Sequence, residues 1–258
     1  MVLYLRRSWA LLLLLLMFGL MGVGVVTVTR PAVESVMAKL TNRLVPIYKV
    51  DTQEAKIAFS FDATWGTENT DKLLEILSAN NVKTTFFLAG NWVSEYPEYV
   101  KKIAAQGHEI GNHSLRHPHM NSLTAEEIYA DLLENHQKIK ALIGKDPDLF
   151  RPPFGEYSNK VIEVAQSLGY YTVQWSIDSL DWKNVSASYI VDRISQAKPG
   201  DIILFHNAGK STPEAVARLL PLLKQRGFQV VPVGELIYRD NYVIESHSGL
   251  QKQLPVAQ

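Results

Sequence analysis

The stretch FSFDATWG (residues 59–66) alternates apolar with small residues, ends on the acid Asp62 and then breaks into a loop. An alternation with a period of two predicts a β-strand. Six more short apolar runs follow along the chain: VKTTFFLAG, HEIGN, LFRPP, YYTVQWSI, DIILFH and FQVVPV. The stretches between them carry apolar residues at three- and four-residue spacing, which predicts helices. The chain is therefore expected to contain about seven βα units.

Sequential strands joined by right-handed helical crossovers form a parallel sheet. This pattern by itself does not separate an open doubly wound sheet from a closed barrel, but both folds place functional groups at the carboxyl ends of their strands. Titratable residues stand at or just after these ends: Asp62, His113 and His117, Arg151, Asp178 and Asp181, and His206. We therefore expect a functional site at this edge of the sheet.

Composition excludes several classes of function. The 258 residues contain 26 Lys and Arg against 26 Asp and Glu, so the formal net charge is zero. A neutral chain lacks the basic surface that polyanion binding needs, which argues against nucleic acid as a partner. The absence of cysteine excludes disulfides, thiolate metal sites and cysteine nucleophiles.

The N-terminus carries a run of about twenty uncharged residues, 9–28, which is long enough to cross the hydrocarbon core of a bilayer as a helix. A cleavable signal peptide has a shorter apolar region and an A-x-A-like site, so an uncleaved signal anchor is favoured. Arg6 and Arg7 precede the run and favour a cytoplasmic N-terminus, although basic residues between 30 and 43 weaken this bias. We expect a single-pass protein of the cell membrane whose main domain lies outside the cytoplasm.

The sequence also predicts how the chain is divided into segments. We expect a short cytoplasmic N-terminus at 1–8, a transmembrane anchor at 9–28, a stalk at 29–54, one αβ domain at 55–240 and a polar tail at 241–258.

Four short motifs carry possible chemistry. In GNHSLRHPH, His113 and His117 are four residues apart, so both imidazoles can reach one cation such as zinc, cobalt or nickel. Such a pair alone is weak support for a metal, because surface or buried structural histidines give the same spacing. His119 follows Pro118 and is expected to face solvent. The segments RPPFG, DSLDW and LFHN are each ambiguous when taken singly.

Taken in order, the segments SFDA, HSLRH, RPPFG, DSLDW and LFH resemble the motifs of the polysaccharide deacetylase family, the NodB-homology domain of carbohydrate esterase family 4. The resemblance covers about residues 55–240. The FDATWG variant together with an N-terminal anchor is most similar to the sporulation-associated PdaB-type branch. The resemblance implies a distorted (β/α)7 TIM-like barrel that hydrolyses the N-acetyl group of amino sugars in peptidoglycan or a related cell-wall glycan.

The resemblance also implies roles for four residues. Asp62 would be the general base, and Arg151 would hold it and tune its pKa. His206 would protonate the leaving amine, and Asp181 would orient His206.

Five further residues would complete the site. The N–H of Phe154 would line the oxyanion hole, and Trp182 and Leu204 would wall the acetyl pocket. His113 and His117 would bind a divalent metal, zinc or otherwise cobalt or nickel.

The chain departs from the family at Ala63, where the family has a second Asp that binds the metal. Water, His119 or Glu68 would complete the coordination shell, or Asp62 would turn to the metal, or hydrolysis would be inefficient. The last alternative gives a glycan-binding or structural protein on the same scaffold. Trp65 would shape the rim of the cleft or pack into the core.

Overall fold

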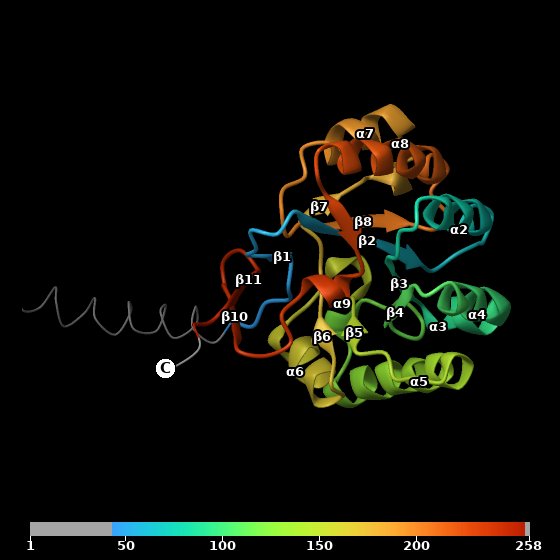
Figure 1. Cartoon of the computed structure of the whole chain (residues 1–258). Coiled ribbons are helices and arrows are strands. Elements are labelled where there is room, and N and C mark those ends of the chain that lie inside the picture. Colours follow the sequence, from blue (N-terminus) through green and yellow to red (C-terminus); the bar gives the residue numbers. More distant parts are fainter. Residues whose placement is uncertain (1–42, 256–258) are drawn as a thin grey trace, which may run out of the picture. The chain divides into compact units, whose positions relative to one another are not determined.

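The computed structural model describes residues 43–255, which form a parallel sheet flanked by helices (Figure 1). The strands of the main sheet are β2 (Lys56–Ala63), β3 (Thr85–Leu88), β4 (Glu109–Asn112), β5 (Leu149–Phe150), β6 (Tyr171–Thr172), β7 (Ile177–Asp178), β8 (Ile202–His206) and β9 (Gln229–Val231). The α-helices are α2 (Thr70–Ala79), α3 (Gly90–Glu95), α4 (Pro97–Ala105), α5 (Ala125–Ile143), α6 (Asn159–Ser167), α7 (Ala187–Ile194), α8 (Thr212–Gln225) and α9 (Val233–Leu236). Short 3₁₀ turns lie at Met120–Ser122, Pro153–Gly155 and Asp181–Lys183.

The strands follow the order β6-β5-β4-β3-β2-β8-β7, and β9 pairs with the start of β2. Every pairing in this sheet is parallel. The parallel αβ architecture predicted from the sequence is therefore confirmed. The long strand β2 lies inside the sheet, with β3 on one side and β8 on the other.

The sheet does not close into the expected barrel. The run YYTVQWSI does not form one strand: it contains β6 and the first residue of β7, and these two short strands pair at opposite ends of the sheet. Within the described residues no pairing joins β6 to β7. Residues 44–50 run through the gap instead: Ile47 exchanges backbone hydrogen bonds with the 172–174 segment, and the Val50 N–H donates to the Gly200 carbonyl. The fold is thus an open half-barrel.

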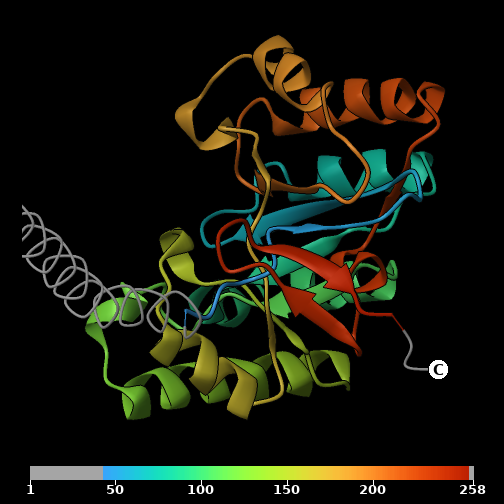
Figure 2. The same ribbon diagram turned by 90° about the vertical axis from the view of Figure 1, so that its left-hand side faces the viewer.

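Both ends of the folded domain differ from the predicted boundaries. Residues 44–54, expected in a stalk, contain the fully buried Ile47 and Val50. Residues 241–258, expected as a polar tail, contain β10 (Tyr242–Ile244) and β11 (Leu250–Gln253), which form a three-stranded sheet with β1 (Lys49–Val50) (Figure 2). The described fold therefore begins near residue 44 and includes residues 44–54 and 241–255.

The predicted anchor, residues 9–28, lies outside the described residues. Within 43–255, no helix combines the length and the hydropathy that crossing a bilayer requires.

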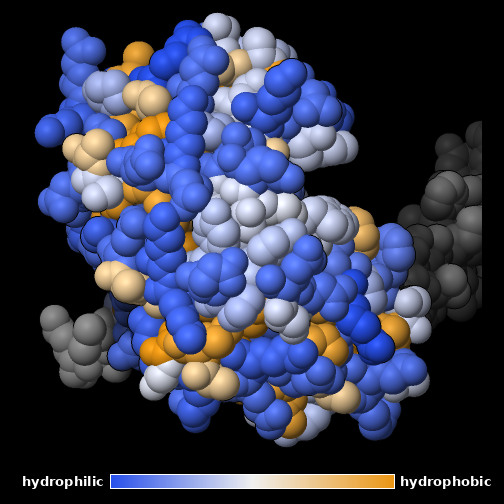
Figure 3. Space-filling model, turned by 90° about the vertical axis from the view of Figure 1, so that its right-hand side faces the viewer, coloured by the Kyte–Doolittle hydropathy of each residue, from blue (hydrophilic) through white to orange (hydrophobic). Residues whose placement is uncertain are grey.

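The side chains of β2 point alternately to the two faces of the sheet, and this alternation decides on which face the site lies. Ile57, Phe59 and Phe61 lie on one face and belong to an apolar cluster that includes leucines of α2 and α8. Ser60 and Asp62 therefore lie on the other face of the strand, away from those helices. The surface seen in Figure 3 is mostly hydrophilic with small hydrophobic patches, as expected when the apolar residues fill the core.

Candidate active site

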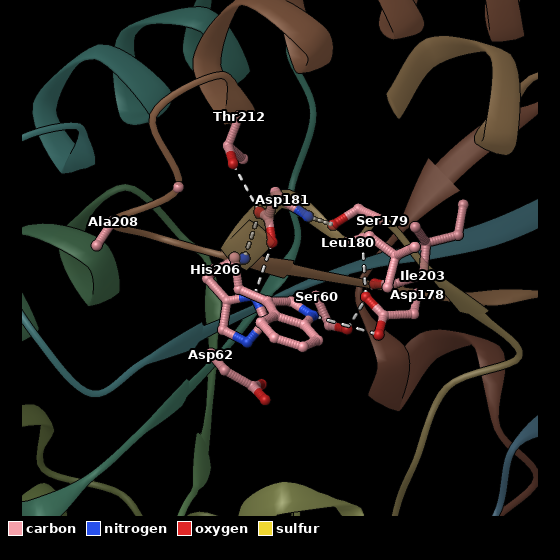
Figure 4. A network of polar contacts seen from close by, with 12 residues as sticks. Ser60, Asp62, Asp178, Ser179, Leu180, Asp181, Ile203, His206, Ala208 and Thr212 are labelled. Atoms are coloured by element: carbon pink, nitrogen blue, oxygen red, sulfur yellow. Dashed lines mark hydrogen bonds and ion pairs between the residues drawn. The ribbon is translucent and has the colours of Figure 1, made fainter. Parts of the chain in front are cut away.

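Asp62 and His206 lie side by side at the carboxyl ends of two adjacent strands. They are Cα partners in the register of β2 with β8. Asp62 is 4% exposed, whereas the His206 side chain is partly exposed. Figure 4 shows the two side chains near each other, with Asp181 beside the His206 ring. The sheet thus brings together the predicted base and the predicted acid, which are far apart in the sequence.

Asp62 is held by a buried guanidinium. Arg151, which follows β5, is fully buried, and its Nη1 donates to Asp62 Oδ1 at 2.8 Å. Its Nη2 donates to Ser60 Oγ at 2.9 Å, so the inner face of β2 fixes both the acid and its partner. Burial would raise the pKa of the Asp62 carboxyl, but Arg151 and the neighbouring imidazoles outweigh burial and lower it. Asp62 is therefore ionised at neutral pH.

A second carboxylate holds His206. Asp181 is fully buried, and its Oδ1 lies 2.7 Å from His206 Nδ1. Its Oδ2 accepts hydrogen bonds from the His206 backbone N–H at 2.8 Å and from the Thr212 hydroxyl at 2.6 Å (Figure 4). Burial would lower the pKa of His206, but the hydrogen bond and charge of Asp181 raise it above its ordinary value. This arrangement fixes the ring and favours its protonated form.

His113, directly after β4, turns one ring nitrogen toward Asp62. Its Nδ1 lies 2.7 Å from the Arg151 carbonyl oxygen, which can only accept, so the proton is on Nδ1 when the ring is neutral. The unprotonated Nε2 lies 3.6 Å from Asp62 Oδ2. Burial lowers the pKa of His113 even though the Asp62 charge opposes this shift. A neutral ring with a free Nε2 lone pair is the form that binds metals.

His117 completes an aromatic group at the mouth of the site. Its ring centroid lies 4.9 Å from that of His113, 4.4 Å from Phe154 and 5.3 Å from Trp65. Burial, reinforced by His113, lowers the pKa of His117 to about 4. Its backbone φ is 56°, in the left-handed region. Both predicted ligand imidazoles are therefore neutral at pH 7 and lie close together.

A third protein donor is missing. Ala63 has no donor atom and is fully buried in the apolar cluster around Phe61. Within residues 43–255, no three His, Cys, Asp or Glu side chains form a group suited to holding a metal ion. His119, one of the suggested substitutes, instead pairs with Glu156 at 2.9 Å. The two neutral imidazoles are suitable ligands for a divalent cation. They would supply only two of its ligands, so the rest of the coordination shell would have to come from groups other than protein side chains.

The three residues predicted to contact substrate lie in different settings. Phe154 is 56% exposed with φ 58°, and Trp182 is 55% exposed. Leu204 is buried on β8, two residues before His206, so both side chains lie on the same face of that strand. Trp65 is 66% exposed, which excludes its packing into the core.

Sequence reasoning missed the polar residues that support the site. Ser60 lies between two phenylalanines of β2 and bonds Arg151, and Thr212 at the start of α8 bonds Asp181. Ser60 carried a usable signal, because a hydroxyl inside an apolar strand on the same face as Asp62 needs a buried partner. The sequence around Thr212 contains no such signal, because a threonine at the start of a helix is common.

Comparison with known proteins agrees with this geometry. The family model described as polysaccharide deacetylase matches residues 49–173. The peptidoglycan-N-acetylmuramic acid deacetylase PdaA of Bacillus subtilis is 34% identical over 196 residues, which cover 74% of each chain. A peptidoglycan-N-acetylglucosamine deacetylase of Bacillus cereus is 36% identical over 196 residues, covering 74% of this chain and 92% of the relative. The uncharacterized protein YlxY of Bacillus subtilis is 38% identical over 193 residues, and the match spans 74% of this chain but 60% of YlxY.

Solved structures show the same fold. The structure of PdaA from Bacillus subtilis, described as a family 4 carbohydrate esterase, has a TM-score of 0.71 at 31% identity, and the match covers 80% of this chain and 88% of that chain. Wild-type BA3943 of Bacillus anthracis, described as a CE4 family pseudoenzyme, has a TM-score of 0.72 at 33% identity. The match covers 74% of this chain and 68% of BA3943. A BA3943 mutant described as having restored enzymatic activity has a TM-score of 0.72 at 34% identity. The match covers 74% of this chain and 71% of the mutant chain. Assignment to the PdaB-type branch stays a prediction.

Proposed function

Since this chain belongs to the polysaccharide deacetylase family, we propose that it hydrolyses N-acetyl groups of amino sugars in peptidoglycan. Water would add to the acetamide carbonyl carbon, the C–N bond would break, and the products would be acetate and a free amine on the sugar. The observation that carries this proposal is the pairing of Asp62 and His206 on adjacent strand ends, each with its own buried partner. By their names, PdaA and the Bacillus cereus relative deacetylate N-acetylmuramic acid and N-acetylglucosamine respectively, and both sugars are candidates here.

Asp62 would take the proton from the attacking water. Its carboxylate stays ionised because Arg151 lowers its pKa, and Oδ2 is not bonded to the guanidinium. Arg151 is itself fixed by Ser60 and the Gln174 carbonyl, so it would act as a holder of the base. A base fixed at the strand end needs little rearrangement to meet the water.

His206 would deliver a proton to the leaving amine. Asp181 holds Nδ1, which leaves Nε2 as the donor toward the substrate. The raised pKa keeps the ring protonated over a wider pH range than an isolated imidazole. The N–H of Phe154 would line the oxyanion hole, and the exposed Trp182 and the buried Leu204 would border the acetyl group.

His113 and His117 would hold a divalent cation, zinc or otherwise cobalt or nickel. Both rings are neutral, and Arg151 fixes the tautomer of His113. When bound, the cation supplies Lewis-acid polarisation of the amide carbonyl and stabilisation of negative charge on its oxygen.

A second candidate is a glycan-binding protein with little or no hydrolysis. Two observations favour it: Ala63 provides no donor atom, and the similar BA3943 is described as a pseudoenzyme. The complete base and acid pairs favour the enzyme, because glycan binding alone needs neither.

One experiment separates the two candidates. The full chain in detergent is incubated with purified peptidoglycan and zinc, and the muropeptides are analysed by mass spectrometry. The enzyme is supported by muropeptides that lack one acetyl group and carry a free amine on the sugar. Sedimentation of the protein with peptidoglycan and unchanged muropeptides with zinc, cobalt or nickel would instead support the glycan-binding candidate.

Residues 9–28 would anchor the chain in the cell membrane, with the αβ domain on the outer side, where peptidoglycan lies. Fractionation of cells and protease treatment of intact spheroplasts test this proposal. Recovery of the intact chain in the soluble fraction, or protection of the domain from protease, would contradict it.

A further inference from the structure

The loop that carries His113 and His117, the proposed metal ligands, has an unfavourable backbone. Residues 113–117 connect the end of β4 to the turn before α5, and two of them have positive φ: Ser114 at 66° and His117 at 56°. A non-glycine residue in the left-handed region costs about 1 kcal/mol or more. This conformation persists only if surrounding groups hold it, so the directions of the His113 and His117 rings depend on those groups.

One buried amide on α5 binds the loop to two strand ends. Asn135 is fully buried, and its Nδ2 lies within hydrogen-bond distance of three acceptors. These are the Leu88 carbonyl at 2.9 Å, Asn112 Oδ1 at 2.8 Å and the Ser114 carbonyl at 2.9 Å. A single side chain therefore ties the ends of β3 and β4 to the first strained residue of the loop.

A carboxylate one helical turn earlier binds the next residue of the loop. Asp131 is 2% exposed, and its Oδ1 accepts the backbone N–H of Leu115 at 2.8 Å. Asp131 and Asn135 are four residues apart, so they project from the same face of α5. Together they bond both polar groups of the peptide unit that joins Ser114 to Leu115: Asn135 donates to its carbonyl, and Asp131 accepts from its N–H.

The start of α3 also bonds the loop. The backbone N–H groups of Gly90 and Asn91 donate to the carbonyls of Ser114 and Leu115, each at 2.9 Å. A Cβ atom at Gly90 would lie 2.6 Å from Leu115 Cδ1 and 2.8 Å from Asn135 Oδ1. The loop is therefore packed tightly between α3 and α5.

We propose that Asn135 and Asp131 are positioning residues that set the directions of the His113 and His117 rings. Both are buried, so neither touches a glycan, and they act through the backbone of the 113–117 loop. Their importance for catalysis rests on the proposed function, but their effect on the two rings does not.

The first test is NMR of the full chain, metal-free and in detergent, with histidine ring carbons labelled. The seven histidines are assigned by single His→Gln variants. Asn135→Leu should change the chemical shifts of the ring protons of His113 and His117. These shifts depend on how the two rings lie against each other and how His117 lies against the rings of Trp65 and Phe154.

The matched control is Gln251→Leu. It also removes a fully buried amide, which bonds Tyr238 in the small sheet of β1, β10 and β11. The control should leave both histidine shifts unchanged. Unchanged shifts in Asn135→Leu, or equal shifts in the control, would overturn the proposal.

The second test is zinc affinity, measured by competition with a chelator. Removal of such supporting partners weakens metal binding about 10- to 100-fold, and we expect this for Asn135→Leu and Asp131→Leu. Asp131→Asn keeps an acceptor oxygen for Leu115 and should bind zinc within about threefold of the wild type. If Asp131→Asn and Asp131→Leu weaken zinc binding equally, the hydrogen bond from the Leu115 N–H to the side chain at position 131 does not position the loop.

The outcomes remain separable from the proposed function. If Asn135→Leu does not fold, the two variants at Asp131 decide the matter through the same ring shifts. If the wild type binds no zinc, the ring shifts alone decide it. Shifted rings in Asn135→Leu, together with no acetate release by the wild type, would refute the proposed hydrolysis and leave the positioning role supported.

Discussion

Asp62 and His206 are neighbours on adjacent strands, yet their surroundings move their pKa values in opposite directions. Arg151 lowers the pKa of Asp62, and Asp181 raises that of His206. An ionised acid and a protonated imidazole can therefore coexist at neutral pH. Hydrolysis of an amide needs this combination, because one group must accept a proton from water while the other donates one to nitrogen.

Replacement of Asp181 by Asn tests the acid. Asp181 raises the pKa of His206, so loss of its charge should lower that pKa and deprotonate the ring at a lower pH. The alkaline limb of the pH profile of kcat/KM for deacetylation should therefore move to lower pH in Asp181→Asn. Asp178→Asn is the comparison variant and should move the limb less, because Asp178 raises the pKa of His206 through its charge alone and does not bond the ring. An alkaline limb at the same pH in Asp181→Asn would contradict the pairing.

Replacement of Ala63 by Asp tests the missing ligand. Ala63 is buried among apolar residues, so a carboxylate there should destabilise the metal-free chain. If the new carboxylate joins His113 and His117 on a cation, zinc should raise Tm more in Ala63→Asp than in the wild type, since ligands stabilise the state they bind. Ala63→Asn controls for polarity without charge. The same zinc-dependent rise in Tm for wild type and Ala63→Asp would contradict this expectation.

At the scale of elements, strand β2 organises the site. Its inner face carries Ser60 and Asp62, and its two neighbours bring Leu88 and His206 to the same edge. These strands were predictable from the sequence, because each is a compact apolar run bounded by a helix pattern. The strand ends were predictable for the same reason, and with them the positions of Asp62 and His206.

Other elements were not predictable from local pattern. Strand β1 pairs with β11, about two hundred residues away, and each is too short and polar to be recognised. The run YYTVQWSI looks like one strand but splits into β6 and β7, because each half pairs with a different neighbour. Long-range pairing decides these segments, and a local window does not contain it.

The C-terminal strands are expected to stabilise the domain. Their removal with residues 241–258 would leave the N–H groups of Tyr48 and Asp51 without the carbonyls of Gly249 and Gln251. It would also remove the buried Gln251 amide from Tyr238. We expect the truncated chain to lose at least about 2 kcal/mol of unfolding free energy, measured in urea. Deletion of 256–258 is the control, and equal urea midpoints for both truncations would contradict this structural role.

At the scale of the whole molecule, the described residues form an open half-barrel, and residues 44–50 run through the gap between β6 and β7. The family resemblance implied a distorted (β/α)7 TIM-like barrel, and the described sheet is more open than that because β6 and β7 do not pair. The motifs predicted which residues gather at the site, because they follow successive strands. The buried support from Thr212, Asp131 and Asn135 could not be predicted, because it depends on how the helices dock on the sheet.

Acetate release from purified peptidoglycan, with zinc added, tests most directly whether the Asp62 carboxylate drives hydrolysis. The full wild-type chain in detergent should release acetate, and Asp62→Asn should be at least about 100-fold slower, because the amide cannot take a proton from water. Circular dichroism should show that the variant is folded. Equal rates for the two chains, or no acetate from the wild type with zinc, cobalt or nickel, would contradict this role.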